Sequence, residues 1–178
     1  MENKLPRRKN LRLKNYDYSQ PGYYFVTICT ENRRNLLCNI VGNDAPVVPS
    51  EIGNEIIQCW ENISLLYENV KTDGFCIMPN HIHGIIVIED TKPQPLSEKT
   101  YGFQSAERRG RRSLPDIIKD FKSVTARQYN KLVEIEFRNT LWQKSYYEHI
   151  IRNELELQEI REYIVNNPVK WVEDEYYI

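Results

Sequence analysis

"MPNHIHGIIVIE", residues 78–89, is the stretch that decides the fold. Its Pro-Asn pair at positions 79–80 suits the centre of a tight turn, and the β-branched run that follows predicts a strand from His81 to Glu89. Side chains two positions apart on a strand point to the same face. One predicted face therefore carries His81, His83, Ile85 and Val87, and the other, which would fill the core, carries Ile82, Gly84, Ile86 and Ile88.

The other predicted elements lie on both sides of this strand in the chain. Before it come a strand at 22–31, an irregular loop at 32–50, a helix from the cap Ser50 to about Tyr67, and a strand at 69–78. After it come a helix of roughly 115–131, a strand within 137–152, and a last helix that Asn153 caps and Pro168 terminates. The order β-α-β-β-α-β matches the ferredoxin-like split βαβ pattern. We therefore expect an α+β fold, an antiparallel sheet with helices on one face plus a C-terminal helix.

The composition is that of one globular domain. The chain has 178 residues, of which 40% are hydrophobic and 28% are charged, and we see no internal repeat. No apolar run approaches the ~20 residues of a membrane span, so no membrane partner is expected. Four cysteines without CxxC spacing predict reduced thiols of a cytoplasmic protein. Residues 1–178 are thus expected to form a single domain with a basic N-terminal arm (about 1–15) and a mobile loop (about 90–112).

Charge is segregated along the chain although the net charge is only −1. The first 14 residues are basic, residues 108–112 read "RRGRR", and the C-terminal segment is acidic. Basic clusters near tyrosines would suit a phosphate backbone, but a solvated tail and loop explain the same pattern. Charge alone therefore does not identify a nucleic-acid-binding protein.

The two histidines of the central strand are candidate metal ligands. Because His81 and His83 share a face, their imidazoles can converge on one divalent ion. Two half-buried polar residues at the start of a strand would give the same pattern. The spacing leaves both readings open.

The last helix offers candidates for the rest of such a site. Tyr163 and Asn167 are four residues apart and so are neighbours on one helical face. Asn167 lies at the helix end, where the partial negative charge of the C-terminus favours a nearby cation. The chain has 12 tyrosines, however, and periodicity alone does not select Tyr163.

Four segments, in order, carry a family resemblance: "YDYSQPGYYFVTICTENR", "MPNHIHGIIVIE", "WQKSYYEHIIRNE" and "REYIVNNPVKW". Together they resemble the REP-associated tyrosine transposases. These are IS200-like transposases of the single-tyrosine HUH (histidine–hydrophobic–histidine) superfamily. The resemblance extends from about Tyr16 to Trp171, so it covers nearly the whole predicted domain.

The resemblance implies a reaction and roles for single residues. It implies that His81 and His83 hold a divalent metal, Mg²⁺ or Mn²⁺, and that Tyr163 on the C-terminal helix attacks DNA. Related transposases carry a glutamine four residues after the tyrosine as third ligand, and Asn167 stands there in this chain. The implied activity is transposition of single-stranded, hairpin-flanked DNA through a 5′-phosphotyrosine intermediate that leaves a free 3′-OH. A metal would polarise the scissile phosphate.

Basic residues are the candidate DNA contacts. They are Arg108, Arg109, Arg111 and Arg112 of the basic cluster, and Lys122 and Arg127 on the second predicted helix. A solvated helix face explains either of the last two equally well. His149 could support the site through a hydrogen bond or could be a packed structural residue.

Two other functions fit part of the pattern. A relaxase or replication-initiator nickase shares the histidine pair, although its tyrosine usually stands elsewhere relative to that pair. A non-catalytic hairpin-binding protein would make Tyr163 dispensable. The protein could be a monomer or a homodimer, so Tyr163 could meet the histidines of its own chain or of a second copy.

Overall fold

A computed structural model describes residues 13, 16–40, 46–90, 112–135 and 139–177 of the chain. The predicted basic arm lies almost entirely outside the described residues, as does nearly all of the predicted mobile loop. Arg108, Arg109 and Arg111 also lie outside them, whereas Arg112 is described.

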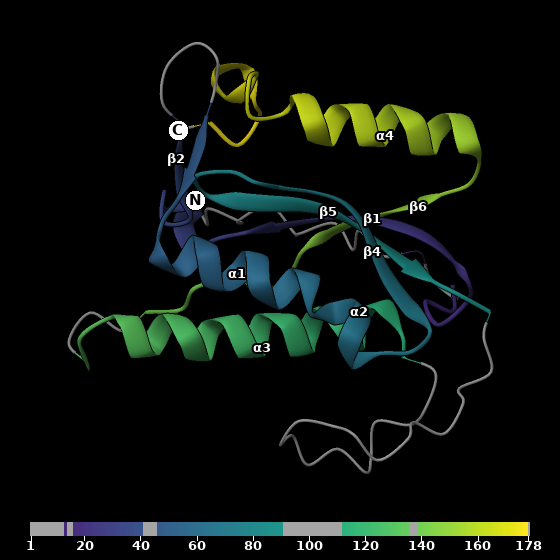
Figure 1. The fold of residues 1–178 in the computed structure, drawn as a ribbon, viewed down its shortest axis with the longest axis horizontal. Helices are drawn as coiled ribbons and strands as arrows, with labels where there is room; N and C mark the ends of the chain where they lie inside the picture. The colour runs from purple at the N-terminus through teal and green to yellow at the C-terminus, as the bar shows by residue number, and fades with distance from the viewer. Residues whose placement is uncertain (1–12, 14–15, 41–45, 91–111, 136–138, 178) are drawn as a thin grey trace, which may run out of the picture.

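A four-stranded antiparallel sheet forms the centre of the molecule. Its strands are β1 (Gly22–Cys29), β4 (Val70–Ile77), β5 (His81–Ile88) and β6 (Tyr147–Ile151), in the order β4-β5-β1-β6. Helices α1 (Glu51–Glu61) and α3 (Leu114–Leu132) cover one face, and α4 (Glu154–Asn166) covers part of the other (Figure 1). The predicted α+β, ferredoxin-like fold with a trailing C-terminal helix is confirmed.

The face towards α1 and α3 holds the larger core. Alternate residues of β5 and β1 point into it and are fully buried, among them Ile82, Ile86 and Val26. Trp60 of α1 lies against Gly84, where a β-carbon would overlap the indole ring. Apolar burial of this kind is the main stabilising contribution to folding.

A smaller apolar cluster joins α4 to the opposite face. Phe25 and Ile85 of the sheet pack with Leu157 and Ile164 of the helix. The helix begins as predicted, because the Asn153 side chain accepts a hydrogen bond from the Glu156 backbone N–H. These contacts hold α4 against this face of the sheet.

The turn between β4 and β5 confirms the prediction at Pro79-Asn80. The Met78 N–H donates to the His81 carbonyl at 2.9 Å, which closes a two-residue hairpin loop. The register then places Cys29 opposite His81, and Thr27 opposite His83. The histidines therefore stand at the end of the sheet where β1 finishes and β5 starts.

Two parts of the fold differ from the sequence prediction. The expected irregular loop contains a one-turn 3₁₀ helix, η1 (Glu31–Arg33), and a hairpin of β2 (Cys38–Ile40) and β3 (Val47–Pro49). The helix predicted to reach about Tyr67 is interrupted at Asn62 and resumes as α2 (Ile63–Leu66). The interruption lets the Ser64 hydroxyl accept a hydrogen bond from the Thr72 N–H, which ties α2 to β4. None of the helices in the described part of the chain has the length and apolar character needed to cross a membrane.

Candidate metal and tyrosine site

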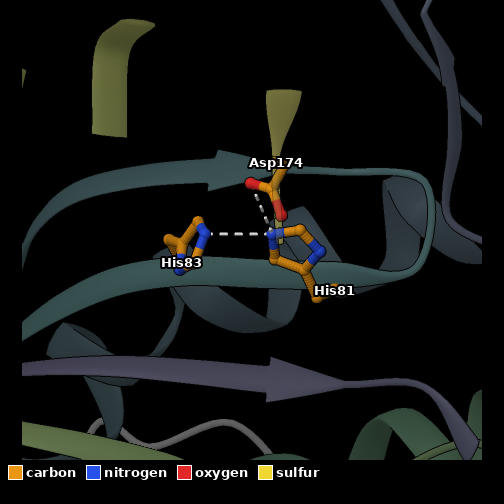
Figure 2. Close-up of side chains that lie close together, drawn as sticks. All are labelled: His81, His83 and Asp174. Carbon is orange, nitrogen blue, oxygen red and sulfur yellow. Dashed lines mark hydrogen bonds and ion pairs between the residues drawn. The ribbon is translucent and has the colours of Figure 1, made fainter. Parts of the chain in front are cut away.

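His81 and His83 form the centre of the site. Their side chains extend from β5 on the α4 side of the sheet, and both residues are at most 1% exposed. Their Nε2 atoms lie 2.9 Å apart and face each other (Figure 2). The predicted convergence of the two imidazoles is therefore present in the structure.

The outer ring nitrogens of both histidines are held by hydrogen-bonding partners. His81 Nδ1 lies 2.9 Å from Asn80 Oδ1, and the Asn80 amide donates in turn to the Tyr176 carbonyl at 2.8 Å. Since that second bond fixes Nδ2 as the donor, Oδ1 must accept from His81 Nδ1–H. In the neutral ring, Nε2 of His81 then carries the free lone pair. His83 Nδ1 lies 2.8 Å from the Thr27 hydroxyl, which can serve the same purpose.

Both imidazoles are held neutral by their surroundings. Burial lowers the pKa of His83 well below its ordinary value. Burial also lowers the pKa of His81, with further contributions from His83 and from the positive charge of Arg33. A metal ion binds the neutral imidazole, so these pKa values favour ligation at neutral pH.

Asp174 completes a three-residue cluster that the sequence did not predict. Its carboxylate lies 3.9 Å from His81 Nε2 (Figure 2), and the ligand atoms of His81, His83 and Asp174 all lie within 4.8 Å of one another. Asp174 follows the short helix η3 (Trp171–Glu173) after α4. In the sequence it is one acid among several at the C-terminus, and no spacing rule connects it to the histidines.

Asn167 lies beside this cluster at the end of α4. It is 4% exposed, and its Oδ1 has no hydrogen-bond donor among the described residues. Its side chain hydrogen-bonds to Tyr163 and to Asp174, and both bonds lower the pKa of the partner. An unpaired buried amide oxygen is costly in the absence of a ligand, and amide and carboxylate oxygens suit Mg²⁺ or Mn²⁺. The donor set therefore fits a divalent ion.

Tyr163 brings a hydroxyl to the same point. Its Oη lies 3.3 Å from His83 Nε2, and 44% of the residue is exposed. Burial of the other part raises the pKa of the phenol to about 12, and the Asp174 carboxylate contributes to this shift. The four residues predicted for the site, together with Asp174, thus meet in one place.

The C-terminal segment covers one side of the histidines. The Tyr176 ring lies 4.6 Å from the His81 ring, centroid to centroid, and the Arg33 guanidinium lies 5.1 Å from the Tyr176 ring centroid. The Asp174 carboxylate accepts the Tyr176 N–H at 2.6 Å. These contacts hold Asp174 against the histidine pair.

An open cleft of about 610 Å³ lies between α4 and this segment. Tyr163 and Asn167 form part of its wall. The charged side chains that line it are five carboxylates and one ammonium group: Glu159, Glu162, Glu173, Asp174, Glu175 and Lys170. This side of Tyr163 is therefore acidic.

The predicted DNA contacts that are described do not join the cluster. Lys122 and Arg127 lie on α3, on the other face of the sheet from α4 (Figure 1). Lys122 Nζ donates to the Gln143 carbonyl at 2.6 Å and to the Lys144 carbonyl at 3.2 Å, and Arg127 donates to the Ser123 hydroxyl. Arg112 is half-buried just before α3. His149 pairs with Glu156 at 2.6 Å, so its observed hydrogen bond secures the start of α4.

Comparison with known proteins finds a family match in the C-terminal half of the chain. Residues 107–167 match the family described as "Transposase IS200 like". A Haemophilus influenzae protein named "Putative REP-associated tyrosine transposase" is 26% identical over 163 residues, which are 89% of this chain and 77% of that protein. The chain is similar to the IS200-like transposases over residues 107–167, the segment that contains Tyr163 and Asn167.

Two further matches cover most of the chain. An uncharacterized Haemophilus influenzae protein is 38% identical over 173 residues, which are 96% of this chain and 93% of that protein. The solved structure titled "Structure of the REP associates tyrosine transposase bound to a REP hairpin" has a TM-score of 0.57 and 16% identity, over 90% of this chain and 73% of the other. At that identity the likeness supports the fold alone.

Proposed function

We propose that the protein is a metal-dependent DNA strand transferase with Tyr163 as nucleophile. It would cleave and rejoin single-stranded, hairpin-flanked DNA through a covalent 5′-phosphotyrosine. The observation that carries this proposal is the contact of 3.3 Å between the Tyr163 hydroxyl and His83 Nε2, beside a candidate metal-binding cluster. This contact presents the Tyr163 hydroxyl to a buried, neutral histidine, as a nucleophile beside a metal site requires.

Two comparisons support a DNA hairpin as the substrate. The family that matches residues 107–167 is one of transposases, and the similar solved structure is of a transposase bound to a REP hairpin. That hairpin complex is of the other protein, and we extend it to this chain because the alignment of the two folds covers 90% of this chain. We propose DNA with a hairpin and a single-stranded flank as the substrate class.

His81, His83 and Asp174 would hold the metal ion, and Asn167 would supply a further oxygen. Mg²⁺ or Mn²⁺ bound there would polarise the scissile phosphate and stabilise negative charge on its oxygens. Asn80 and Thr27 would orient the imidazoles. Asp174 is our addition to the ligands that the sequence suggested.

The tyrosine must lose its proton during the attack, because the pKa of its phenol is about 12. The Asn167 hydrogen bond lowers that pKa and therefore stabilises the developing phenolate. As the bond from Tyr163 Oη to phosphorus forms, the bond from phosphorus to the 3′-oxygen breaks, and the 3′-oxygen takes up a proton. The phosphotyrosine ester conserves the energy of the phosphodiester bond, so attack by a 3′-OH can rejoin the strand without a nucleotide cofactor.

One chain is sufficient to assemble this arrangement. Tyr163 contacts His83 of its own chain, so we propose a site that requires no exchange of α4 between two copies. A solution mass measurement of an active preparation tests this point. We also retain Arg108, Arg109, Arg111, Arg112, Lys122 and Arg127 as proposed contacts to the DNA backbone.

The test is a covalent-adduct assay. A labelled hairpin oligonucleotide with a single-stranded flank is incubated with the protein and Mn²⁺ or Mg²⁺, and adducts are resolved on a denaturing gel. Wild-type protein and the control Tyr177→Phe, which alters another exposed tyrosine, should form the adduct. Tyr163→Phe should form none, and a combined His81→Ala and His83→Ala change should reduce both cleavage and Mn²⁺ affinity.

Two outcomes would contradict the proposal. An adduct that persists in Tyr163→Phe would exclude this nucleophile. Hairpin binding without an adduct under either metal would identify a non-catalytic binding protein instead.

A further inference from the structure

A row of residues leads from the edge of the sheet to the tyrosine site. In the strand register, Tyr147 of β6 is opposite Thr27 of β1, and Thr27 is opposite His83 of β5. Neighbouring strands lie about 4.8 Å apart, so Tyr147 begins about 10 Å from His83 along this row. Since β6 is an edge strand, the row opens to solvent at Tyr147.

A buried phenylalanine joins the two tyrosines that flank this row. The Phe25 ring lies 6.3 Å from the Tyr147 ring and 6.0 Å from the Tyr163 ring, and both contacts are edge-to-face. Phe25 is only 8% exposed, whereas Tyr147 is 39% exposed and Tyr163 is 44% exposed. Phe25 also stacks on the His83 ring at 5.4 Å. The result is a chain of contacting rings from the sheet edge to the nucleophile, with an exposed tyrosine at each end.

Charge distinguishes the two sides from which a DNA strand could reach Tyr163. The cleft on the α4 side is lined by five carboxylates and one lysine, which repel a phosphate backbone. Just before β6, by contrast, Lys144 is exposed three residues from Tyr147, and the neighbouring acid Glu148 is buried. A nucleic-acid strand is therefore favoured on the β6 side.

We infer that Tyr147 is a stacking residue for a base of single-stranded DNA, about one or two nucleotides from the phosphate that Tyr163 attacks. The inference rests on the proposed function and adds the side from which the strand arrives. Stacking on an exposed ring is tolerant of sequence, because every base has an aromatic face. Phe25 would hold the Tyr147 ring in place from below and leave one face of that ring to the base.

The experiment uses the full chain and an oligonucleotide of about 12 deoxythymidines in EDTA, so that no cleavage occurs. A single 2-aminopurine is placed at successive positions, and its fluorescence and the anisotropy of an end label are measured. Wild-type protein should quench one position strongly. Tyr147→Leu keeps the apolar volume but loses the ring, and should raise Kd roughly 5- to 150-fold and abolish that quenching.

Two further variants separate stacking from structural support. Tyr147→Trp should restore both affinity and quenching, because it restores an aromatic face. Tyr23→Leu is the matched control: Tyr23 is 37% exposed on the same face of the sheet, but four positions along β1 from Thr27. It should leave Kd within about twofold of the wild-type value, since surface changes away from a site have small effects.

The outcomes distinguish this inference from the proposed function. Wild-type binding and quenching that Tyr147→Leu leaves unchanged would overturn the stacking role alone. A wild-type protein that binds this oligonucleotide without quenching at any position would also overturn the stacking role, whereas the proposed function is overturned only by the adduct assay on hairpin DNA.

Discussion

The two faces of strand β5 are built from alternate residues of one short segment and serve different ends. Ile82, Gly84 and Ile86 point into the core beneath α1 and α3, where the apolar cluster is large. His81 and His83 point the other way, towards α4 and the C-terminal segment. The difference teaches that one strand can stabilise the fold on one side and position chemistry on the other.

The α4 side contains buried polar groups that the core side of β5 lacks. His81, His83 and Asn167 are all at most 4% exposed, and the Asn167 amide oxygen has no donor among the described residues. Buried polar groups contribute less to stability than apolar ones, and unpaired ones reduce it. We therefore expect substitutions on the core side to affect folding strongly, and substitutions on the α4 side to affect mainly function.

The largest stability effect is expected for Trp60→Ala on the core side. Trp60 is 2% exposed and packs against Phe75 and Phe121, with ring centroids 5.0 and 5.6 Å away. Removing this side chain should lower the free energy of unfolding by about 3–5 kcal/mol, measured by urea denaturation. Leu65→Ala, at an 81% exposed position, is the control and should stay within about 0.5 kcal/mol of wild type. Equal losses for both variants would contradict the assigned core.

Alanine substitutions at two glycines, one on each face of the sheet, compare the packing of the two faces directly. A β-carbon on Gly84 would lie 2.6 Å from Trp60 Cη2, whereas one on Gly74 would meet Ile164 Cδ1 at 3.3 Å. Gly84→Ala should therefore cost about 1–3 kcal/mol of unfolding free energy through overpacking, and Gly74→Ala should cost clearly less. The reverse order would show that α4 packs more tightly than α1, against this account.

The smallest effect is expected from the ion pair that ties α4 to β4. Arg161 donates to both oxygens of Asp73, at 3.2 and 2.6 Å, and this contact lowers the pKa of the Asp73 carboxyl. The folded-state pKa is below the unfolded value, so the stabilisation is present above about pH 4 and is lost as the pH falls through the folded-state pKa.

Arg161→Met tests this contact. The variant should be slightly less stable than wild type at pH 7, and the difference should vanish in acid. Thermal unfolding across this pH range provides the measurement. A difference that persists in acid would mean that the Arg161 stem packs, and that its charge contributes little.

The alternation within residues 81–88 made the fold predictable from sequence. The histidines had to share a face, and the isoleucines on the opposite face had to be buried. The hairpin of β2 and β3 escaped prediction because each strand has only three residues and Pro49 ends one of them. The break at Asn62 escaped prediction as well, since it depends on a tertiary hydrogen bond from Thr72 to Ser64.

The site was only partly predictable. Periodicity placed Tyr163 and Asn167 on one helical face. Their connection to the histidines came from the family resemblance, because no spacing rule predicts it. Asp174 could not be found in this way, because its position depends on how the chain returns after α4 to the end of β5. The contact between Tyr147 and Phe25 likewise requires the strand register.

The most direct test of the central claim is to locate the DNA attachment point by peptide mass spectrometry. Trypsin cuts after Arg161 and after Lys170, which releases residues 162–170 with Tyr163 as their only tyrosine. Tyr176 and Tyr177 fall in the separate peptide 171–178. The account predicts that the nucleotide mass is found on the peptide 162–170 after reaction with a hairpin oligonucleotide and Mn²⁺. Attachment to any other tyrosine peptide would contradict it.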